Sequence, residues 1–229
     1  MKIGGLQKFS LIDYPGKICA VLFTQGCNFR CPYCHNPELV NPRLYGTSIP
    51  EGEFFKFLAN RQGKLDAVVV TGGEPTIQAD LVDLISRIKT MNFLVKIDTN
   101  GSFPRVLEEL IERELVNYIA MDVKAPLERY EEITASPINP SDIEKSIGLI
   151  MKSGIDYEFR TTVAKLLLDE KDIMRIGETI AGARKLVLQK FVPSKTLDEK
   201  FLITETYSDE EFKEFKRCLS SYVNTVSVR

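Results

Sequence analysis

Short apolar runs alternate with longer amphipathic stretches along the middle of the chain. The short runs are rich in Val, Ile and Leu, which is typical of parallel strands buried on both faces, and the longer stretches repeat apolar residues at helical spacing. The predicted strands are Ile18–Phe23, Asp66–Thr71, Phe93–Asp98, Val116–Asp122, Asp156–Val163 and Lys185–Val192. The predicted helices are Pro50–Arg61, Ile77–Met91, Pro104–Glu114, Asp142–Ser153 and Glu170–Arg184. The alternation predicts an α/β fold built from repeated βα units.

Residues that begin or end a helix support these boundaries. In chain order they are the capping-box pair Ser48 and Glu51, the N-cap Ser141, the left-handed C-terminal residue Gly154, and the capping-box pair Ser208 and Glu211. The last pair predicts a final helix over Asp209–Tyr222, and Val223–Val228 is expected to form a short strand after it. The segment Lys195–Glu205 is expected to be a loop.

The length of the chain and the absence of a linker predict one domain over residues 1–229. A chain of 229 residues with 44% hydrophobic residues can bury a large core, and no Pro-, Gly- or Ser-rich segment divides it. Six βα units fit either a doubly wound sheet or an incomplete barrel. In both architectures the functional groups belong at the C-terminal ends of the strands.

Charge and cysteine usage narrow the class of protein. The net charge is −2, with 30 basic and 32 acidic residues interspersed, so neither nucleic acid nor an anionic membrane is an expected partner. No apolar run is long enough to cross a membrane, and the N-terminus lacks the pattern of a signal peptide. The five cysteines are an odd number, which does not suit a secreted disulfide framework. A reducing cytoplasmic location is expected, with Cys19 and Cys218 as small buried side chains.

Three of the five cysteines, Cys27, Cys31 and Cys34, lie within eight residues of each other in C-N-F-R-C-P-Y-C. Three thiolates can hold an iron–sulfur cluster and leave one position open for a further ligand. A structural zinc site that adds His35 and a dithiol redox site of Cys31 and Cys34 are the alternatives. The spacing Cys31-x-x-Cys34-His35 also fits c-type haem attachment, but that modification requires export. From these residues alone the cluster, the zinc site and the dithiol stay open.

Polar groups follow three consecutive predicted strands. The second strand ends in Gly72-Gly73-Glu74, where two glycines allow close approach of a ligand to the backbone. The third ends in Asp98-Thr99-Asn100 and the fourth in Asp122-Val123-Lys124. Helix capping would explain some of the Asp and Asn residues, and an ion pair with Glu158 or with a neighbouring strand would explain Arg160 in the fifth strand. The alternative for Lys124 and Arg160 is that they face an anionic ligand.

The cysteine loop and the Gly-Gly-Glu turn together resemble the radical SAM superfamily. Its members carry a C-x-x-x-C-x-Φ-C loop after the first strand, where Φ is aromatic, here Tyr33, and a GGE turn after the second. The resemblance covers about residues 10–192, which would form the core as a partial (β/α)6 barrel, and it leaves about residues 193–229 as a C-terminal extension. It also implies that Cys27, Cys31 and Cys34 hold a [4Fe–4S] cluster whose fourth iron binds S-adenosylmethionine. No side chain is then required as a general acid or base, and no catalytic side chain is expected.

Further motifs are similar to those of the glycyl-radical-enzyme activases within that superfamily. They are Ser10-x-x-Asp13-Tyr14-Pro15-Gly16-Lys17, Phe23-Thr24-Gln25-Gly26-Cys27-Asn28 and Cys34-His35-Asn36-Pro37. The resemblance implies a 5′-deoxyadenosyl radical that abstracts hydrogen from a glycine Cα. The implied partner is a glycyl radical enzyme, with anaerobic ribonucleoside-triphosphate reductase closest, and the implied electron donor is a flavodoxin or ferredoxin. Loops at Asn36–Thr47 and Ser194–Glu205 are expected to decide partner choice.

The resemblance also assigns cofactor contacts by position. The residues expected at the cofactors are Tyr33, His35, Gly72, Gly73, Glu74, Asp98, Asp122, Lys124 and Arg160. Gly72 to Glu74 would receive the methionine ammonium, Asp98 and Lys124 would contact S-adenosylmethionine, and Asp98, Thr99 and Asp122 could line a monovalent-cation site. The chain departs from the pattern at Gln189–Phe191, where a ligand-contacting histidine is expected. A radical SAM enzyme acting on a small molecule, such as one like 7-carboxy-7-deazaguanine synthase, and a zinc-stabilised binding module are the alternative functions.

Overall fold

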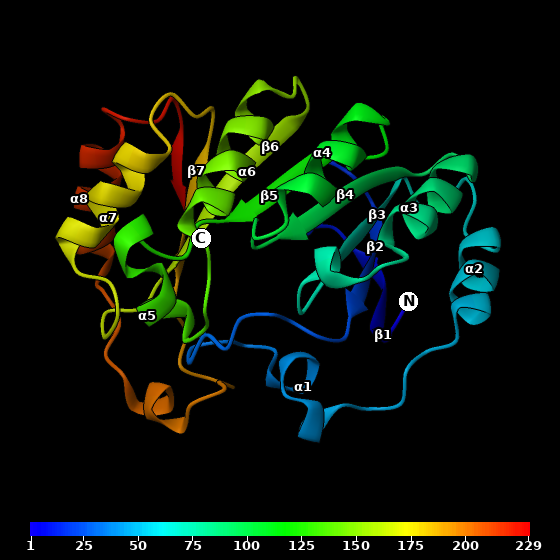
Figure 1. The fold of residues 1–229 in the computed structure, drawn as a ribbon, viewed down its shortest axis with the longest axis horizontal. Coiled ribbons are helices and arrows are strands. Elements are labelled where there is room, and N and C mark those ends of the chain that lie inside the picture. Colours follow the sequence, from blue (N-terminus) through cyan, green and yellow to red (C-terminus); the bar gives the residue numbers. More distant parts are fainter. The chain divides into compact units, whose positions relative to one another are not determined.

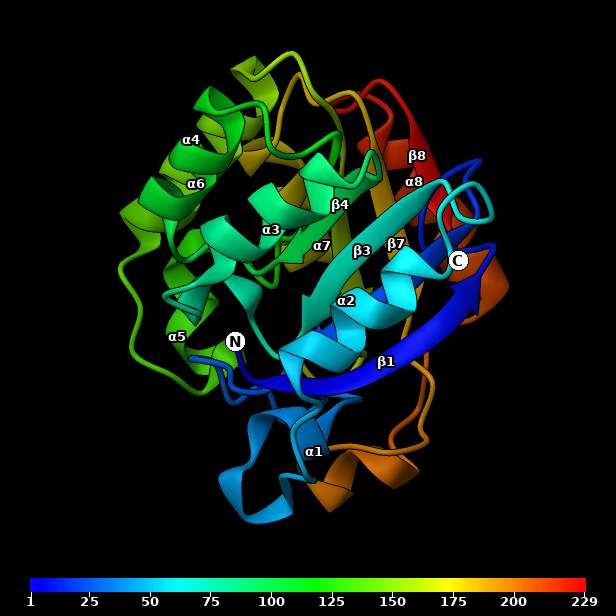
Figure 2. The same ribbon diagram turned by 90° about the vertical axis from the view of Figure 1, so that its right-hand side faces the viewer.

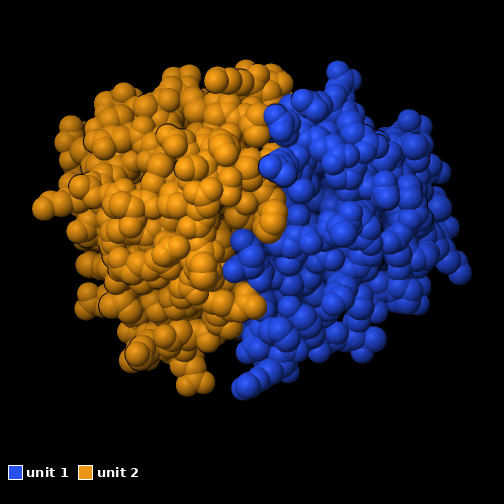
Figure 3. All heavy atoms as spheres, in the orientation of Figure 1, with its two compact units in different colours: residues 1–28, 36–99, 105–119 blue, residues 29–35, 100–104, 120–229 orange.

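The structure is a computed structural model that describes residues 1–229, and the chain divides into two compact units. Figure 3 colours the first unit blue and the second orange. Unit 1 contains Met1–Asn28, Asn36–Thr99 and Arg105–Ile119, and unit 2 contains Phe29–His35, Asn100–Pro104 and Ala120–Arg229. The cysteine loop therefore begins in unit 1 and continues in unit 2. The expectation of a single domain stays a prediction, and each unit is described by itself.

Unit 1 is built on four strands, β1 (Ile3–Ser10), β2 (Cys19–Thr24), β3 (Ala67–Gly72) and β4 (Leu94–Thr99). Strand β1 is antiparallel to β2, with Ser10 opposite Cys19, and it is seen along its length in Figure 2. Strands β2, β3 and β4 are parallel, and Thr24 lies opposite Gly72 at their C-terminal ends. Val68, Val69 and Val70 are fully buried, as expected for a strand covered on both faces.

The helices of unit 1 follow its strands in the βα order that the sequence predicts (Figure 1). They are α1 (Pro37–Val40), α2 (Glu51–Ala59), α3 (Leu81–Thr90) and α4 (Pro104–Glu112), of which α4 lies in this unit from Arg105. Helix α3 buries Leu81, Leu84, Ile85 and Ile88, which lie three and four residues apart on one face. The helix that the sequence predicts over Ile77–Met91 therefore forms, but it begins four residues later than predicted and ends one residue earlier.

Unit 2 contains the end of β5 (Tyr118–Asp122), followed by β6 (Asp156–Val163), β7 (Leu186–Lys190) and β8 (Val226–Val228). Phe159 of β6 lies opposite Leu186 of β7, which in turn lies opposite Val226 of β8, and all these pairs are parallel. The helices are α5 (Tyr130–Thr134), α6 (Pro140–Lys152), α7 (Glu170–Thr179) and α8 (Asp209–Leu219) (Figure 1). Gly177 of α7 lies so close to α8 that a Cβ there would be 2.4 Å from Leu219.

The predicted α/β fold with parallel strands is confirmed, and the differences are shifted element ends and a few additional short elements. All six predicted strands form, with ends that shift by at most two residues, and β8 forms within the predicted final segment. Strand β1 was not predicted. The segment Lys195–Glu205 is not entirely a loop, because it contains the 3₁₀ helix η4 (Glu199–Ile203). No helix has the length and apolar character that crossing a membrane requires.

Two of the predicted helix caps are wrong. Helix α2 begins after Pro50 without a side-chain cap, because the Ser48 hydroxyl instead exchanges hydrogen bonds of 3.1 Å with the backbone N–H and C=O of Ile3. Helix α6 is capped by Asn139, whose side chain accepts from the N–H of Ser141. The capping box of α8 at Ser208 and the left-handed Gly154 are confirmed.

The two isolated cysteines differ in environment. Cys19 is fully buried at the start of β2, as expected. Cys218 of α8 is only half-buried, and its thiol donates to Glu214 at 3.4 Å, so the expectation that it is a small buried side chain is wrong. The helix turns that thiol toward its polar face, four residues from the carboxylate.

Candidate functional site

The start of the cysteine loop is fixed in unit 1 by backbone hydrogen bonds from the Gly-Gly-Glu turn. The N–H of Gly73 donates to the carbonyl of Thr24 at 2.9 Å, and the N–H of Glu74 donates to the carbonyl of Gly26 at 2.8 Å. The N–H of Gly26 donates to the carbonyl of Leu39 at 2.7 Å. These bonds join the ends of β2 and β3 and hold the backbone immediately before Cys27. The turn therefore supports the loop that carries the first cysteine.

Only glycine fits at the two central positions of this turn. A Cβ on Gly73 would lie 2.0 Å from the carbonyl oxygen of Gly26, and one on Gly72, where φ is +129°, would lie 2.2 Å from the nitrogen of Thr24. Both distances are far inside van der Waals contact, and the obstructing atoms are backbone atoms that cannot rotate away. The glycines are thus required by the close approach of β3 to the cysteine loop.

Gly73→Ala is expected to destabilise the iron-free protein by about 1–3 kcal/mol, because the new methyl group overpacks against backbone. Urea unfolding measures the loss of stability. The variant should also take up less iron than the wild type on anaerobic reconstitution. The control is Gly52→Ala in α2, where a Cβ would meet no atom within 4 Å. That control should leave stability unchanged or raise it by up to about 1 kcal/mol. Equal stability of the two variants would contradict the packing argument.

Glu74 is buried, with 1% of its surface exposed, and its carboxylate has a structural role. The oxygen Oε1 accepts hydrogen bonds from the N–H of Thr76 at 3.1 Å, the hydroxyl of Thr76 at 2.5 Å and the hydroxyl of Thr99 at 2.7 Å. The bonds from Thr76 cap the short 3₁₀ helix η2 (Pro75–Ile77), and the bond from Thr99 joins the end of β3 to the end of β4. Any contact of Glu74 with an ammonium group would be made in addition to these three.

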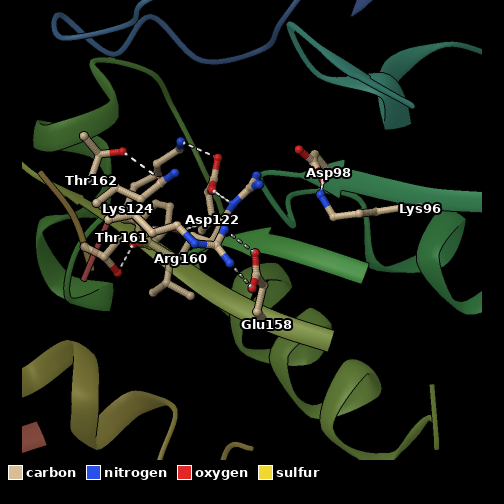
Figure 4. Close-up of polar contacts among 12 residues, drawn as sticks. Lys96, Asp98, Asp122, Lys124, Glu158, Arg160, Thr161 and Thr162 are labelled. Carbon is tan, nitrogen blue, oxygen red and sulfur yellow. Dashed lines mark hydrogen bonds and ion pairs between the residues drawn. The ribbon is translucent and has the colours of Figure 1, made fainter. Parts of the chain in front are cut away.

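Asp98 is paired with a lysine from the same strand. Lys96 and Asp98 lie on one face of β4, and their Nζ and Oδ1 atoms are 2.5 Å apart (Figure 4). The Lys96 side chain is 3% exposed and that of Asp98 is 14% exposed. The ammonium also lies 5.9 Å from the centre of the Tyr118 ring. Lys96 was not predicted as a site residue, although a lysine in an otherwise apolar strand two residues before Asp98 was the available signal.

The second and third cysteines lie in unit 2, in a turn closed by a 3.0 Å hydrogen bond from the N–H of Cys34 to the carbonyl of Cys31. Cys31 is buried, and burial raises the pKa of its thiol to about 11, against the lowering influence of the Lys124 ammonium. Tyr33 is buried beside it, and its hydroxyl has no hydrogen-bond partner in the structure. Burial, followed by the influence of Cys31, also raises the pKa of Tyr33. Cys31, Tyr33 and Lys124 thus belong to one electrostatic environment.

A second cluster of charged side chains lies in unit 2, at the end of β5 and in the middle of β6. Asp122 binds Lys124 through Oδ2 at 2.9 Å and Arg160 through Oδ1 at 2.8 Å (Figure 4). Burial alone would raise the pKa of Asp122, but the two cations outweigh it and hold that pKa well below the ordinary value. Burial disfavours the Lys124 ammonium, yet the Asp122 carboxylate raises the pKa of Lys124 above its ordinary value. All three groups are therefore charged at neutral pH.

Arg160 forms an ion pair with Asp122 of β5. An ion pair with a neighbouring strand was one of the alternatives that the sequence analysis gave for this residue. Arg160 also points toward Glu158 in Figure 4, and it is one of the cations that hold the pKa of this buried carboxylate below its ordinary value. Burial opposes that lowering, and the hydrogen bond from Lys185 is the largest favourable contribution. The backbone N–H of Lys124 donates to the hydroxyl of Tyr130 at 3.0 Å. Sequence reasoning missed Tyr130, which no local motif marks.

Aromatic packing joins the C-terminal part of the cysteine loop to the segment after β7. The His35 ring stacks on Phe191 with 5.3 Å between centroids, and its Nε2 lies 3.0 Å from the carbonyl oxygen of Val192. Phe201 of η4 contacts both Phe191 and Tyr33, with centroid distances of 6.0 and 6.4 Å. The N–H of Asp198 donates to the carbonyl of Pro32 at 2.9 Å. Phe191, within the Gln189–Phe191 segment where a histidine is expected, therefore packs against the loop.

The residues of the cysteine loop and of the Gly-Gly-Glu turn fit the groups that the cysteine motif implies. Three thiols in one loop are the donor set of an iron–sulfur cluster with one open position, and Gly72 and Gly73 keep the neighbouring turn free of side chains. The buried Tyr33 hydroxyl without a partner indicates a polar neighbour that the chain itself does not supply. No three His, Cys, Asp or Glu side chains of the structure form a metal-ion group. The assignment of the cluster ligands accordingly rests on the motif and its donor chemistry.

Comparison with known proteins agrees with this description. The model of the radical SAM superfamily matches residues 21–179, which is more than half of the chain. A Methanocaldococcus jannaschii protein named "Putative glycyl-radical enzyme activating enzyme MJ1227" is 36% identical, over 99% of this chain and 95% of that protein. The pyruvate formate-lyase-activating enzyme of Clostridium pasteurianum is 27% identical, over 86% of this chain and 83% of that enzyme. A "Probable GTP 3',8-cyclase" of Pyrococcus horikoshii is also 27% identical, over 79% of this chain and 63% of that protein.

Among solved structures, Streptococcus suis SuiB matches with a TM-score of 0.68 and 13% identity. The match covers 91% of this chain, which spans about half of SuiB, 48% of its length, so the likeness concerns the fold alone. The chain belongs to the radical SAM superfamily. It is therefore an enzyme of the class that uses a [4Fe–4S] cluster and S-adenosylmethionine.

Proposed function

We propose that this enzyme generates a glycyl radical on a partner protein, and that the partner is an anaerobic ribonucleoside-triphosphate reductase. The observation that carries the proposal is the 36% identity, over nearly the whole of both chains, to a protein named as an activating enzyme of a glycyl-radical enzyme. The likeness to a pyruvate formate-lyase-activating enzyme supports the same reaction class. The Ser10-to-Lys17 motif supports the choice of reductase as the partner.

When bound, the cluster and S-adenosylmethionine would supply the chemistry, which is one-electron reductive cleavage to methionine and a 5′-deoxyadenosyl radical able to take a hydrogen atom from a glycine Cα. A reduced flavodoxin or ferredoxin would supply the electron. The protein has to hold these groups and exclude water from them. Cys27, Cys31 and Cys34 would hold the iron, and Tyr33 would cover it.

Charged groups at the strand ends would bind the polar parts of S-adenosylmethionine. Asp98 and Lys124 would contact it directly, and the Gly72-to-Glu74 turn would face its methionine ammonium. Lys124 is a partly buried cation 2.9 Å from Asp122, and it is suited to a carboxylate or hydroxyl group. Arg160 would act through Asp122, which it binds at 2.8 Å. His35 would act through the loop, because its ring is stacked on Phe191.

The proposal is tested by measuring 5′-deoxyadenosine and the glycyl radical in one experiment. The protein is reconstituted anaerobically with iron and sulfide, reduced with dithionite and incubated with S-adenosylmethionine, with and without the reductase. The expected result is cofactor cleavage together with a glycyl radical EPR doublet on the reductase. A reductase whose C-terminal loop glycine is replaced by alanine should give no doublet.

A small-molecule substrate is the second candidate, and the likeness to GTP 3',8-cyclases is the observation that favours it. Incubation of the same reduced protein with GTP in place of the reductase separates the two candidates. Formation of 5′-deoxyadenosine that depends on GTP, with no doublet on the reductase, would overturn the activase proposal. A doublet on pyruvate formate-lyase instead of the reductase would retain the reaction class and replace the partner.

A further inference from the structure

Lys96 is a buried cation that the proposed chemistry does not use. It lies in the middle of β4, opposite Val69 of β3, and only 2% of its surface is exposed. Its side chain extends toward the C-terminal end of the strand, where it meets Asp98. A lysine is seldom buried unless it is paired. The position therefore needs a reason beyond the packing of an apolar strand.

The carboxylates expected to line a monovalent-cation site are each already neutralised by the chain. Asp98 is bound by Lys96 at 2.5 Å within unit 1. Asp122 is bound by both Lys124 and Arg160 within unit 2. The hydroxyl of Thr99 donates a hydrogen bond to Oε1 of Glu74 at 2.7 Å. A sodium or potassium ion at either aspartate would meet an ammonium or guanidinium group that already occupies a carboxylate oxygen.

These contacts do not fit a site that depends on a bound monovalent cation. We infer that the Lys96 ammonium takes the place of that cation at Asp98. It is a positioning residue that holds the Asp98 carboxylate in place at the C-terminal end of β4. The inference rests on membership of the superfamily and on the Lys96–Asp98 contact, and it holds whichever partner or substrate the enzyme has.

The test measures binding of S-adenosylmethionine to the reconstituted full chain by equilibrium dialysis in potassium, sodium or choline chloride of equal ionic strength. The wild-type dissociation constant should change by less than about twofold between these salts, since no small cation is needed. Lys96→Met removes the charge and keeps most of the volume. It should weaken binding at least about tenfold in choline, because it leaves Asp98 without its cation, and should regain part of the loss in sodium or potassium.

A merely structural role for Lys96 would weaken binding equally in all three salts, so the salt dependence of the variant is the deciding readout. Lys89→Met is the matched control, because Lys89 binds the amide oxygen of Asn117 at 3.0 Å in the same unit. In the Lys89→Met variant the dissociation constant of S-adenosylmethionine should not depend on the cation.

If Lys96→Met does not fold, the salt dependence of wild-type binding still tests the inference. Lys96→Arg, which keeps the positive charge, should bind S-adenosylmethionine as the wild type does. Wild-type binding that is lost when choline replaces sodium and potassium would overturn the inference, and so would a Lys96→Met protein that equals the wild type in every salt.

Discussion

Replacing Cys31 by alanine is expected to prevent assembly of the iron–sulfur cluster and to reduce cleavage of S-adenosylmethionine by more than about 100-fold. This loss is larger than the one expected when a residue that only supports a metal ligand is removed. The reason is that two thiolates cannot hold a cluster whose fourth iron must stay open to the cofactor. After anaerobic reconstitution, the wild type should contain about four irons per chain, whereas the variant should lack them.

The matched control for this experiment is Cys218→Ala, because Cys218 lies on α8 with a half-buried thiol that contacts Glu214. That variant should retain iron, sulfide and activity. Stoichiometric zinc with no iron in the wild type would contradict the cluster assignment and would favour the Cys₃His zinc alternative that includes His35. A Cys31→Ala protein that still takes up a full cluster would contradict the ligand assignment.

The parallel strands could be predicted because they are buried on both faces. Val68 to Val70 is a continuous apolar run, and in an α/β chain such a run is typical of a buried parallel strand. Strand β1 could not be predicted in the same way. Its sequence, IGGLQKFS, contains two glycines and polar residues, and only Ile3 and Ser10 are buried. Pairing with β2, which is a tertiary contact, makes this segment a strand.

The positions of the candidate site residues could be predicted from the strand ends and from the cysteine spacing. The sequence placed Asp98, Asp122 and Lys124 at the ends of parallel strands, and the structure has them there. The partners of these groups were not predictable. Lys96 meets Asp98 because the strand alternates and the lysine is long, while the contact of His35 with Phe191 joins residues far apart in the chain. Local pattern gives the positions of functional groups, but pairing depends on packing.

Asp122→Asn is expected to lower the free energy of unfolding of the iron-free protein by about 2–4 kcal/mol. The expected loss is slightly smaller than that caused by breaking a fully buried ion pair, because the three side chains are partly exposed. The variant would leave Lys124 and Arg160, whose side chains are 16% and 13% exposed, without the carboxylate that both bind. Urea unfolding at pH 7 measures the loss. Glu109→Gln, which breaks the exposed pair of Glu109 with Arg113 on α4, is the control and should cost less than about 0.5 kcal/mol.

The pH dependence of this loss separates the charge of Asp122 from its shape. The two cations hold the pKa of folded Asp122 well below its ordinary value of 3.8. As pH falls toward that value, the unfolded chain takes up a proton at Asp122 while the folded protein does not, so the stabilisation by the ionised group diminishes. The difference between wild type and Asp122→Asn should therefore be constant from about pH 5 to 8 and shrink below about pH 4. A difference that persists unchanged at low pH would mean that the asparagine disturbs packing, and that the charge of Asp122 contributes little to holding Lys124 and Arg160 in place.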